Sequence, residues 1–184
     1  MTPYVYFLSI YYVFLHRYSG QEDILIGSPV SNRDQKSLED TIGFFNDTLI
    51  LRTGISGSNS FSEVLDKVKQ TFLEAFSNKS VPFDYLVREL KQERSLAVNP
   101  FFQVMFLFYS AEEKQSFGEG LEMDYEFYNP GVSKFDLTLY VLEDKGKLSF
   151  CFEYSTDLFH SETITRFQEH IAILVEAAIK NTER

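Results

Sequence analysis

A segment near the N-terminus that is apolar on almost every side constrains the fold most. Residues 3–18 contain an apolar run of about 12 residues, residues 4–15, in which Ser9 is the one polar residue apart from tyrosine hydroxyls. A bilayer-spanning helix needs roughly 20 apolar residues, so the run is too short to cross a membrane. It is followed by His16, Arg17 and Tyr18 rather than by a small-residue cleavage site, which argues against a signal peptide. We therefore predict a central helix that the rest of the chain surrounds.

The composition predicts one globular domain over residues 1–184. Hydrophobic residues make up 44% of the chain and charged residues 24%, as in soluble proteins. There are 19 Phe and 11 Tyr but no Trp. This aromatic surface predicts a thick core or a face that another protein covers.

The formal net charge of -10 makes nucleic acid and anionic membrane poor partners, because the acidic field repels their phosphates. Cys151 is the only cysteine in the sequence. It excludes an internal disulfide and a multi-cysteine metal site, so no metal is expected. A lone cysteine also fits a reducing compartment, and we predict a cytoplasmic protein.

The first half of the chain alternates strands and helices. Residues 23–30 and 44–52 read as strands, and Ser60 with Glu63 forms a capping box at the start of a helix. The predicted core face of that helix holds Phe61, Val64, Leu65, Val68, Phe72, Leu73 and Phe76. Pro82 is expected as the first residue of a shorter helix.

The second half reads mainly as strands. They are predicted at residues 101–109, 121–128, 134–143 and 147–156. A final helix begins near Ser161. The fold class is therefore α+β, a mixed β-sheet with packed helices, and its strand order cannot be read from the sequence.

General catalytic motifs are absent from the sequence, and we predict no catalytic residue in this chain. His16, His160 and His170 read as structural or solvated, and Cys151 as an inert thiol in a strand. Asp136 lies between apolar neighbours, where a carboxylate needs a partner. It reads as a member of a buried ion pair or as a general acid or base.

Arg88, Lys91 and Arg94 recur every three residues beside the apolar stripe of the shorter helix. They form either a solvated basic face or a docking patch for an acidic partner.

Six motifs in order resemble the condensation domains of nonribosomal peptide synthetases, and the resemblance runs from about residue 3 to 179. The motifs are GSPVSNR (27–33), IGFFNDTLILR (42–52), SVPFDYLV (80–87), NPFFQVMF (99–106), KFDLTL (134–139) and EYSTDLF (153–159). Such domains have a chloramphenicol acetyltransferase-like fold of two lobes with a tunnel between them. The resemblance implies that this chain is the C-terminal lobe and that the N-terminal lobe is absent.

The resemblance also implies the reaction and the partners. Condensation domains join an acyl or peptidyl thioester to an aminoacyl amine, both held on the phosphopantetheine arms of carrier proteins. The implied partners are the N-terminal lobe, peptidyl or acyl carrier proteins and adenylation domains, with no cofactor bound to this chain. The family chemistry is associated with an H-H-x-x-x-D-G motif, and these 184 residues contain no adjacent histidines. The chain alone is therefore expected to be inactive.

Site residues follow from the matched motifs. Arg33 matches the arginine that pairs with the aspartate of H-H-x-x-x-D-G across the lobe interface, and Asp136 matches a structural aspartate. The tunnel floor is expected to include Ile42, Gly43, Asn46, Asp47 and Thr48. Asn46-Asp47 stands where the family usually has Val-Asn, which places an acid near the floor.

Two other interpretations remain. The chain could be a non-catalytic module that docks carrier proteins, in which case Arg88, Lys91 and Arg94 would contact the acidic carrier. It could also derive from a degenerate, epimerising or cyclising variant, or from a relative that uses coenzyme A.

Overall fold

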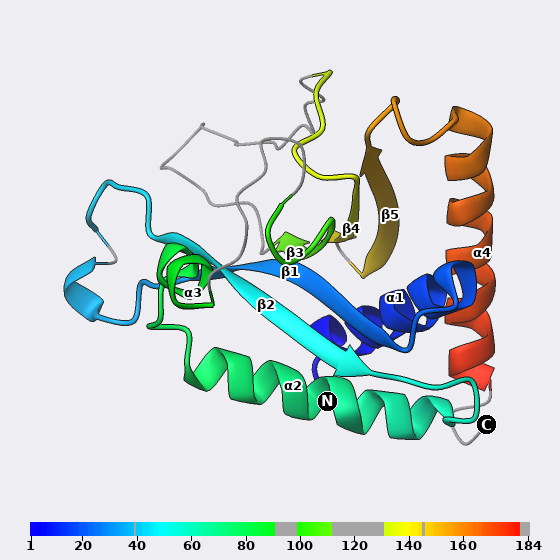
Figure 1. Cartoon of the computed structure of the whole chain (residues 1–184), viewed down its shortest axis with the longest axis horizontal. Helices are drawn as coiled ribbons and strands as arrows, with labels where there is room; N and C mark the ends of the chain where they lie inside the picture. The colour runs from blue at the N-terminus through cyan, green and yellow to red at the C-terminus, as the bar shows by residue number, and fades with distance from the viewer. Residues whose placement is uncertain (39, 91–98, 112–130, 145, 181–184) are drawn as a thin grey trace.

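The computed structural model of the chain describes residues 1–38, 40–90, 99–111, 131–144 and 146–180. Figure 1 shows one mixed sheet with packed helices, which confirms the α+β prediction. The strands are β1 (Asp23–Ser31), β2 (Asn46–Gly54), β3 (Val104–Ala111), β4 (Leu137–Asp144) and β5 (Lys147–Tyr154). The helices are α1 (Pro3–Ser19), α2 (Phe61–Ser77), α3 (Phe83–Glu89), α4 (Ser161–Lys180) and the 3-10 helix η1 (Lys36–Leu38).

The helix α1 is the centre of the molecule, as predicted. Thr2 caps its N-terminus by accepting a hydrogen bond from the Val5 amide, and Gly20 ends it with φ 69°. Its side chains share one hydrophobic core with residues of α2, α4 and all five strands. Among the described residues, no helix has the length and apolarity needed to span a membrane.

The capping box at the start of α2 is confirmed. The Glu63 amide donates to Ser60 Oγ at 3.3 Å, and the Ser60 amide donates to Glu63 Oε2 at 2.8 Å. The predicted core face was wrong at its end, because Leu73 and Phe76 are exposed. Pro82 is the N-cap of α3 rather than its first residue, because the helix begins at Phe83.

Three strands begin later than predicted. The β2 strand begins at Asn46, and β4 begins at Leu137. The β3 strand begins at Val104 because residues 99–103 turn on Asn99, whose side chain accepts from the Phe101 amide at 3.3 Å. The strand predicted at residues 121–128 lies outside the described residues.

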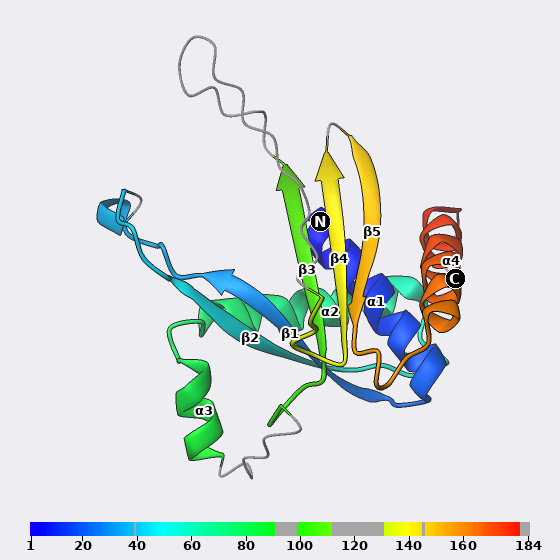
Figure 2. The same cartoon turned by 90° about the horizontal axis from the view of Figure 1, so that it is seen from above.

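The sheet order is β2-β1-β3-β4-β5, and the sheet opens between β1 and β3. These two parallel strands pair at Gly27 and Met105, whereas β1 pairs with β2 over its whole length. Two residues beyond Gly27, Pro29 has no amide hydrogen and so cannot donate a hydrogen bond that would continue the pairing of β1 with β3. Beyond Gly27 the β1–β2 ribbon runs away from β3, as Figure 2 shows. We call this divergence the fork, and residues 32–45, which connect β1 to β2, the arm.

Candidate functional site

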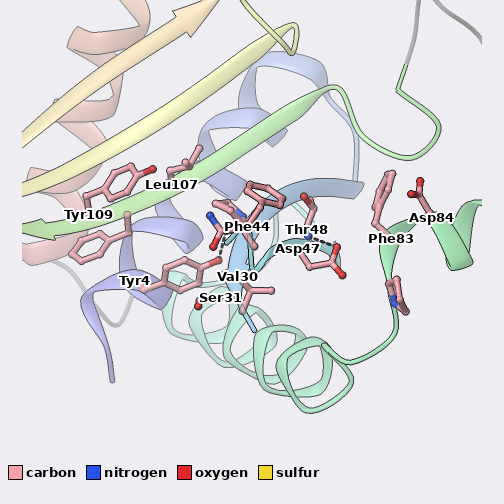
Figure 3. A pocket seen from close by; sticks show the side chains of 15 residues that line it. Tyr4, Val30, Ser31, Phe44, Asp47, Thr48, Phe83, Asp84, Leu107 and Tyr109 are labelled. Carbon is pink, nitrogen blue, oxygen red and sulfur yellow. Dashed lines mark hydrogen bonds between the residues drawn. The ribbon is translucent and has the colours of Figure 1, made fainter. Parts of the chain in front are cut away.

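A cavity of about 840 Å³ lies at the fork. Its lining comes from Tyr4 of α1, residues 28–31 of β1, Phe44 and residues 46–48, residues 82–84 at the start of α3, and residues 107–109 of β3. In Figure 3, Tyr4 and Tyr109 lie on one side and Phe83 and Asp84 on the other, with Asp47 and Thr48 between them. The fork thus brings together residues from five separate elements.

Two hydroxyl groups connect the cavity wall to the sheet. Tyr4 Oη donates to Ser28 Oγ at 2.7 Å, and Ser28 Oγ donates to the Phe106 carbonyl oxygen at 2.9 Å. Burial raises the pKa of Tyr4 to about 12, so the phenol stays protonated at neutral pH. The pair can donate or accept hydrogen bonds but cannot act as a strong base there.

Arg33 organises the arm. Its guanidinium donates to the carbonyl oxygens of Leu38, Thr41 (2.8 Å) and Gly43 (3.1 Å), and it lies 4.3 Å from the centroid of the Phe45 ring. Within the described residues these acceptors are neutral, so the positive charge of Arg33 is solvated or available to an anion. The predicted pairing of Arg33 with an aspartate of another lobe stays a prediction.

The predicted tunnel floor is brought together in part. Asn46, Asp47 and Thr48 line the cavity, and Asp47 Oδ1 accepts from the Thr48 amide at 2.7 Å. Ile42 and Gly43 do not line it, because they lie on the arm, where Ile42 is fully exposed. Phe44, next to them, does line the cavity.

Asp136 and the basic residues lie elsewhere. The backbone of Asp136 bonds to Gln103 and Ser155 at the start of β4, and its side chain is half-buried. No cation pairs with its carboxylate in the described part of the chain, so the expected ion pair is not found there. Arg88 is exposed on α3 and does not line the cavity. Lys91 and Arg94 lie outside the described residues.

His16, His170 and Cys151 have structural surroundings, and the backbone carbonyl of His160 accepts from the amides of Thr163 and Ile164. His16 Nδ1 lies 2.7 Å from the Gln21 carbonyl oxygen, and His170 Nδ1 lies 2.6 Å from Tyr18 Oη. Burial raises the pKa of the half-buried Cys151 thiol, which disfavours the reactive thiolate. Across the described ranges, no three His, Cys, Asp or Glu side chains could hold a metal ion together.

Sequence reasoning missed several residues of the cavity. Tyr4 and Tyr109 reach it because α1 and β3 meet at the fork, and Asp84 reaches it because α3 contacts β2. No spacing pattern relates these positions, since the sheet topology alone makes them neighbours.

The structure resembles solved synthetase domains. One is a holo four-domain nonribosomal peptide synthetase bound to AMP and glycine, with a TM-score of 0.90 and 20% identity over 100% of this chain and 15% of that one. Another is the X-domain from teicoplanin biosynthesis, with a TM-score of 0.86 and 21% identity over 100% of this chain and 42% of that one. At these identities the likeness shows the fold, which is that of chloramphenicol acetyltransferase-like condensation domains.

Sequence relatives give closer matches. A linear gramicidin synthase of Brevibacillus parabrevis is 43% identical over 180 residues, 97% of this chain and 4% of that protein. Bacitracin synthase 3 of Bacillus licheniformis is 39% identical over 183 residues, 100% of this chain and 3% of that protein. The chain therefore spans only a small part of these synthetases. A family model described as "Condensation domain" matches residues 1–184. Since that match covers every element around the fork, this chain belongs to the condensation-domain family of nonribosomal peptide synthetases.

Proposed function

We propose that this chain is one lobe of an amide-forming condensation domain and supplies one wall of its reaction tunnel. The observation that carries the proposal is the cavity of about 840 Å³ at the fork. In the proposed reaction, an aminoacyl amine attacks an acyl or peptidyl thioester, the C–N bond forms, and the C–S bond to the donor arm breaks. Both substrates arrive on the phosphopantetheine arms of carrier proteins that work with adenylation domains.

The side chains of the cavity suit positioning rather than proton transfer. Within the described residues, its lining contains hydroxyl, amide and carboxylate groups but no histidine. The hydroxyls of Tyr4 and Thr48 can orient polar groups of a substrate, while Phe83 and Leu107 give the cavity an apolar wall. We propose that the group that deprotonates the amine comes from an H-H-x-x-x-D-G motif on a second lobe.

Exposed apolar residues on the arm support a contact with that second lobe. Ile42 is 102% exposed and Phe44 is 88% exposed, although both are large and apolar. Arg33 at the base of the arm offers a positive charge to an aspartate of the other lobe. We propose that the arm packs against this lobe and closes the cavity into a tunnel.

A hybrid synthetase tests the proposal. This chain replaces the matching 180 residues in a condensation domain of the linear gramicidin synthase described above. Donor and acceptor carrier proteins are loaded, and the amide product is measured by mass spectrometry. We expect product from the hybrid and none from the 184-residue chain alone. Replacing the second histidine of H-H-x-x-x-D-G by alanine is the negative control.

The same experiment distinguishes the catalytic proposal from the interpretation of the chain as a docking module. A folded hybrid that binds loaded carrier proteins but forms no amide would contradict the catalytic proposal. If Arg88→Glu then weakened carrier binding more at low salt than at high salt, a docking role would replace it.

A further inference from the structure

We propose that Lys79 is a positioning residue that fixes the width of the cavity. It lies between the end of α2 and Pro82, where the chain turns toward α3. Its side chain reaches across to the base of the arm. The consequence for catalysis rests on the proposed function, whereas the consequence for the geometry does not.

The contacts of Lys79 make a defined site for its ammonium group. Nζ donates to the Ser31 carbonyl oxygen at 3.0 Å, pairs with the Asp34 carboxylate, and lies 4.6 Å from the centroid of the Phe76 ring. The Lys79 side chain is only 13% exposed, while that of Asp34 is 63% exposed. A desolvated cation with a carbonyl, a carboxylate and a ring face around it has one favoured geometry. The Phe76 ring, which is partly exposed on α2, thus faces this ammonium group rather than the core.

These contacts join opposite sides of the cavity. Ser31 ends β1 and lines the cavity beside the arm, whereas Pro82 and Phe83, three and four residues after Lys79, line it from α3. The start of α3 is also held by Phe83, which packs against Phe101 and Phe102 at ring-centroid distances of 5.8 and 5.9 Å, and α3 contacts β2. To these contacts Lys79 adds a polar tie, which joins the chain just before α3 to the end of β1 and to Asp34 of the arm.

Lys67, on the α2 helix that ends just before Lys79, is a matched control. Its Nζ donates to the Gly54 carbonyl oxygen at 3.2 Å and to Asn59 Oδ1 at 2.9 Å. It thus ties α2 to the other end of β2, and neither acceptor lines the cavity. Removing either lysine deletes one ammonium group and its hydrogen bonds, but only Lys79 links the arm to α3.

The geometric test uses two spin labels in the 184-residue chain. The labels are placed at Ile42→Cys on the arm and Glu89→Cys on α3, with Cys151→Ser removing the native thiol. Pulsed electron–electron double resonance gives the distance distribution between them. We expect Lys79→Met to lengthen and broaden this distribution, and Lys79→Arg and Lys67→Met to leave it unchanged. If circular dichroism shows that Lys79→Met does not fold, Asp34→Ala is used instead. It removes the ion pair with Lys79 by changing the exposed partner. An unchanged distribution in the folded variant overturns the proposal.

The catalytic test uses the hybrid synthetase. For Lys79→Met we expect the acceptor KM to rise about tenfold, with a smaller change in kcat, because a wider tunnel positions the acceptor poorly. Lys79→Arg should restore KM, and Lys67→Met should leave it unchanged. Equal effects of Lys79→Met and Lys67→Met would assign Lys79 a merely structural role. If the unmodified hybrid makes no amide, the proposed function fails, and the spin-label distances still decide the role of Lys79.

Discussion

At the scale of single residues, Gly27 shows why the fork needs a glycine. A Cβ atom placed on Gly27 would lie 2.2 Å from Phe102 Cε2 and 2.4 Å from Cζ. The Phe102 ring is buried and packs between Phe83 and Phe135. It cannot move aside without opening the contact between α3 and the sheet. Gly27 therefore lets the Phe102 ring lie directly on β1 at the point where β1 and β3 diverge.

We expect Gly27→Ala to lower the free energy of unfolding by about 1–3 kcal/mol, because it overpacks this contact. Urea denaturation followed by circular dichroism measures the change. Gly54→Ala is the control, since nothing lies within 4 Å of a Cβ at that position. Equal stability of the two variants would show that Phe102 does not confine β1.

Tyr11 and Tyr12 differ in the hydrogen bonding of their hydroxyl groups, and single substitutions can measure the effect on stability. Both are buried, but Tyr12 Oη donates to the Leu51 carbonyl oxygen at 2.7 Å, whereas Tyr11 Oη has no partner in the described part of the chain. We expect Tyr11→Phe to raise the free energy of unfolding by about 1 kcal/mol and Tyr12→Phe to lower it by a similar amount. Thermal and urea unfolding of both variants measure this. A loss of stability in Tyr11→Phe would mean that its hydroxyl is hydrogen-bonded.

At the scale of elements, α1 makes the domain sensitive to alkali. Burial raises the pKa of Tyr4 to about 12, and it raises the pKa of Tyr11 and Tyr12 further. In the unfolded chain these phenols titrate near their ordinary pKa of about 10. Their contribution to stability is therefore complete below pH 10 and is lost as the pH rises through 12.

We expect the absorbance of tyrosinate at 295 nm to rise in two phases. Tyr4, Tyr11 and Tyr12 of α1 titrate in the later phase, together with the loss of helical circular dichroism. Tyr4→Phe should reduce only this later phase. Complete titration near pH 10 with helical structure intact would contradict the burial of α1.

The elements were more predictable from the sequence than the site was. The apolar character of residues 4–15 predicted α1, hydrophobic periodicity predicted α2 and α4, and the capping box marked the start of α2, because these signals are local. Periodicity could not show that Phe76 covers Lys79 instead of the core. It also could not show that Asp136 precedes β4, where backbone contacts hold it without an ion pair among the described residues.

At the scale of the whole molecule, the arm and the fork give the chain one face with a cavity and exposed apolar side chains. The strand order and the fork depend on pairing between residues far apart in sequence, so no local pattern predicts them. Residues 46–48, which the family motifs assign to a tunnel floor, line the cavity, but the motifs do not reveal which other elements meet them there. If this face contacts a second lobe as proposed, substitutions on it should affect the association of the two lobes and leave the stability of this chain unchanged.

We expect Ile42→Ser to leave the unfolding midpoint of the 184-residue chain unchanged, because its side chain is fully exposed. In the hybrid synthetase the same substitution should lower amide formation, because we propose that the arm packs on the other lobe there. Ile173→Ser on α4 is the control, and we expect it to be neutral in both measurements. Unchanged activity of the Ile42→Ser hybrid would contradict a buried arm.

The sparse pairing between β1 and β3 has a consequence for how the molecule opens. One half of the sheet is the β1–β2 hairpin with α2, and the other is β3, β4 and β5, with β4 paired fully to both neighbours. The two halves are joined in the sheet by the pairing of Gly27 on β1 with Met105 on β3. Their separation would therefore break few backbone hydrogen bonds. Amide hydrogen exchange should therefore resolve two cooperative units of unequal protection. Substrates at the fork would bind at the boundary between these units and hold them together.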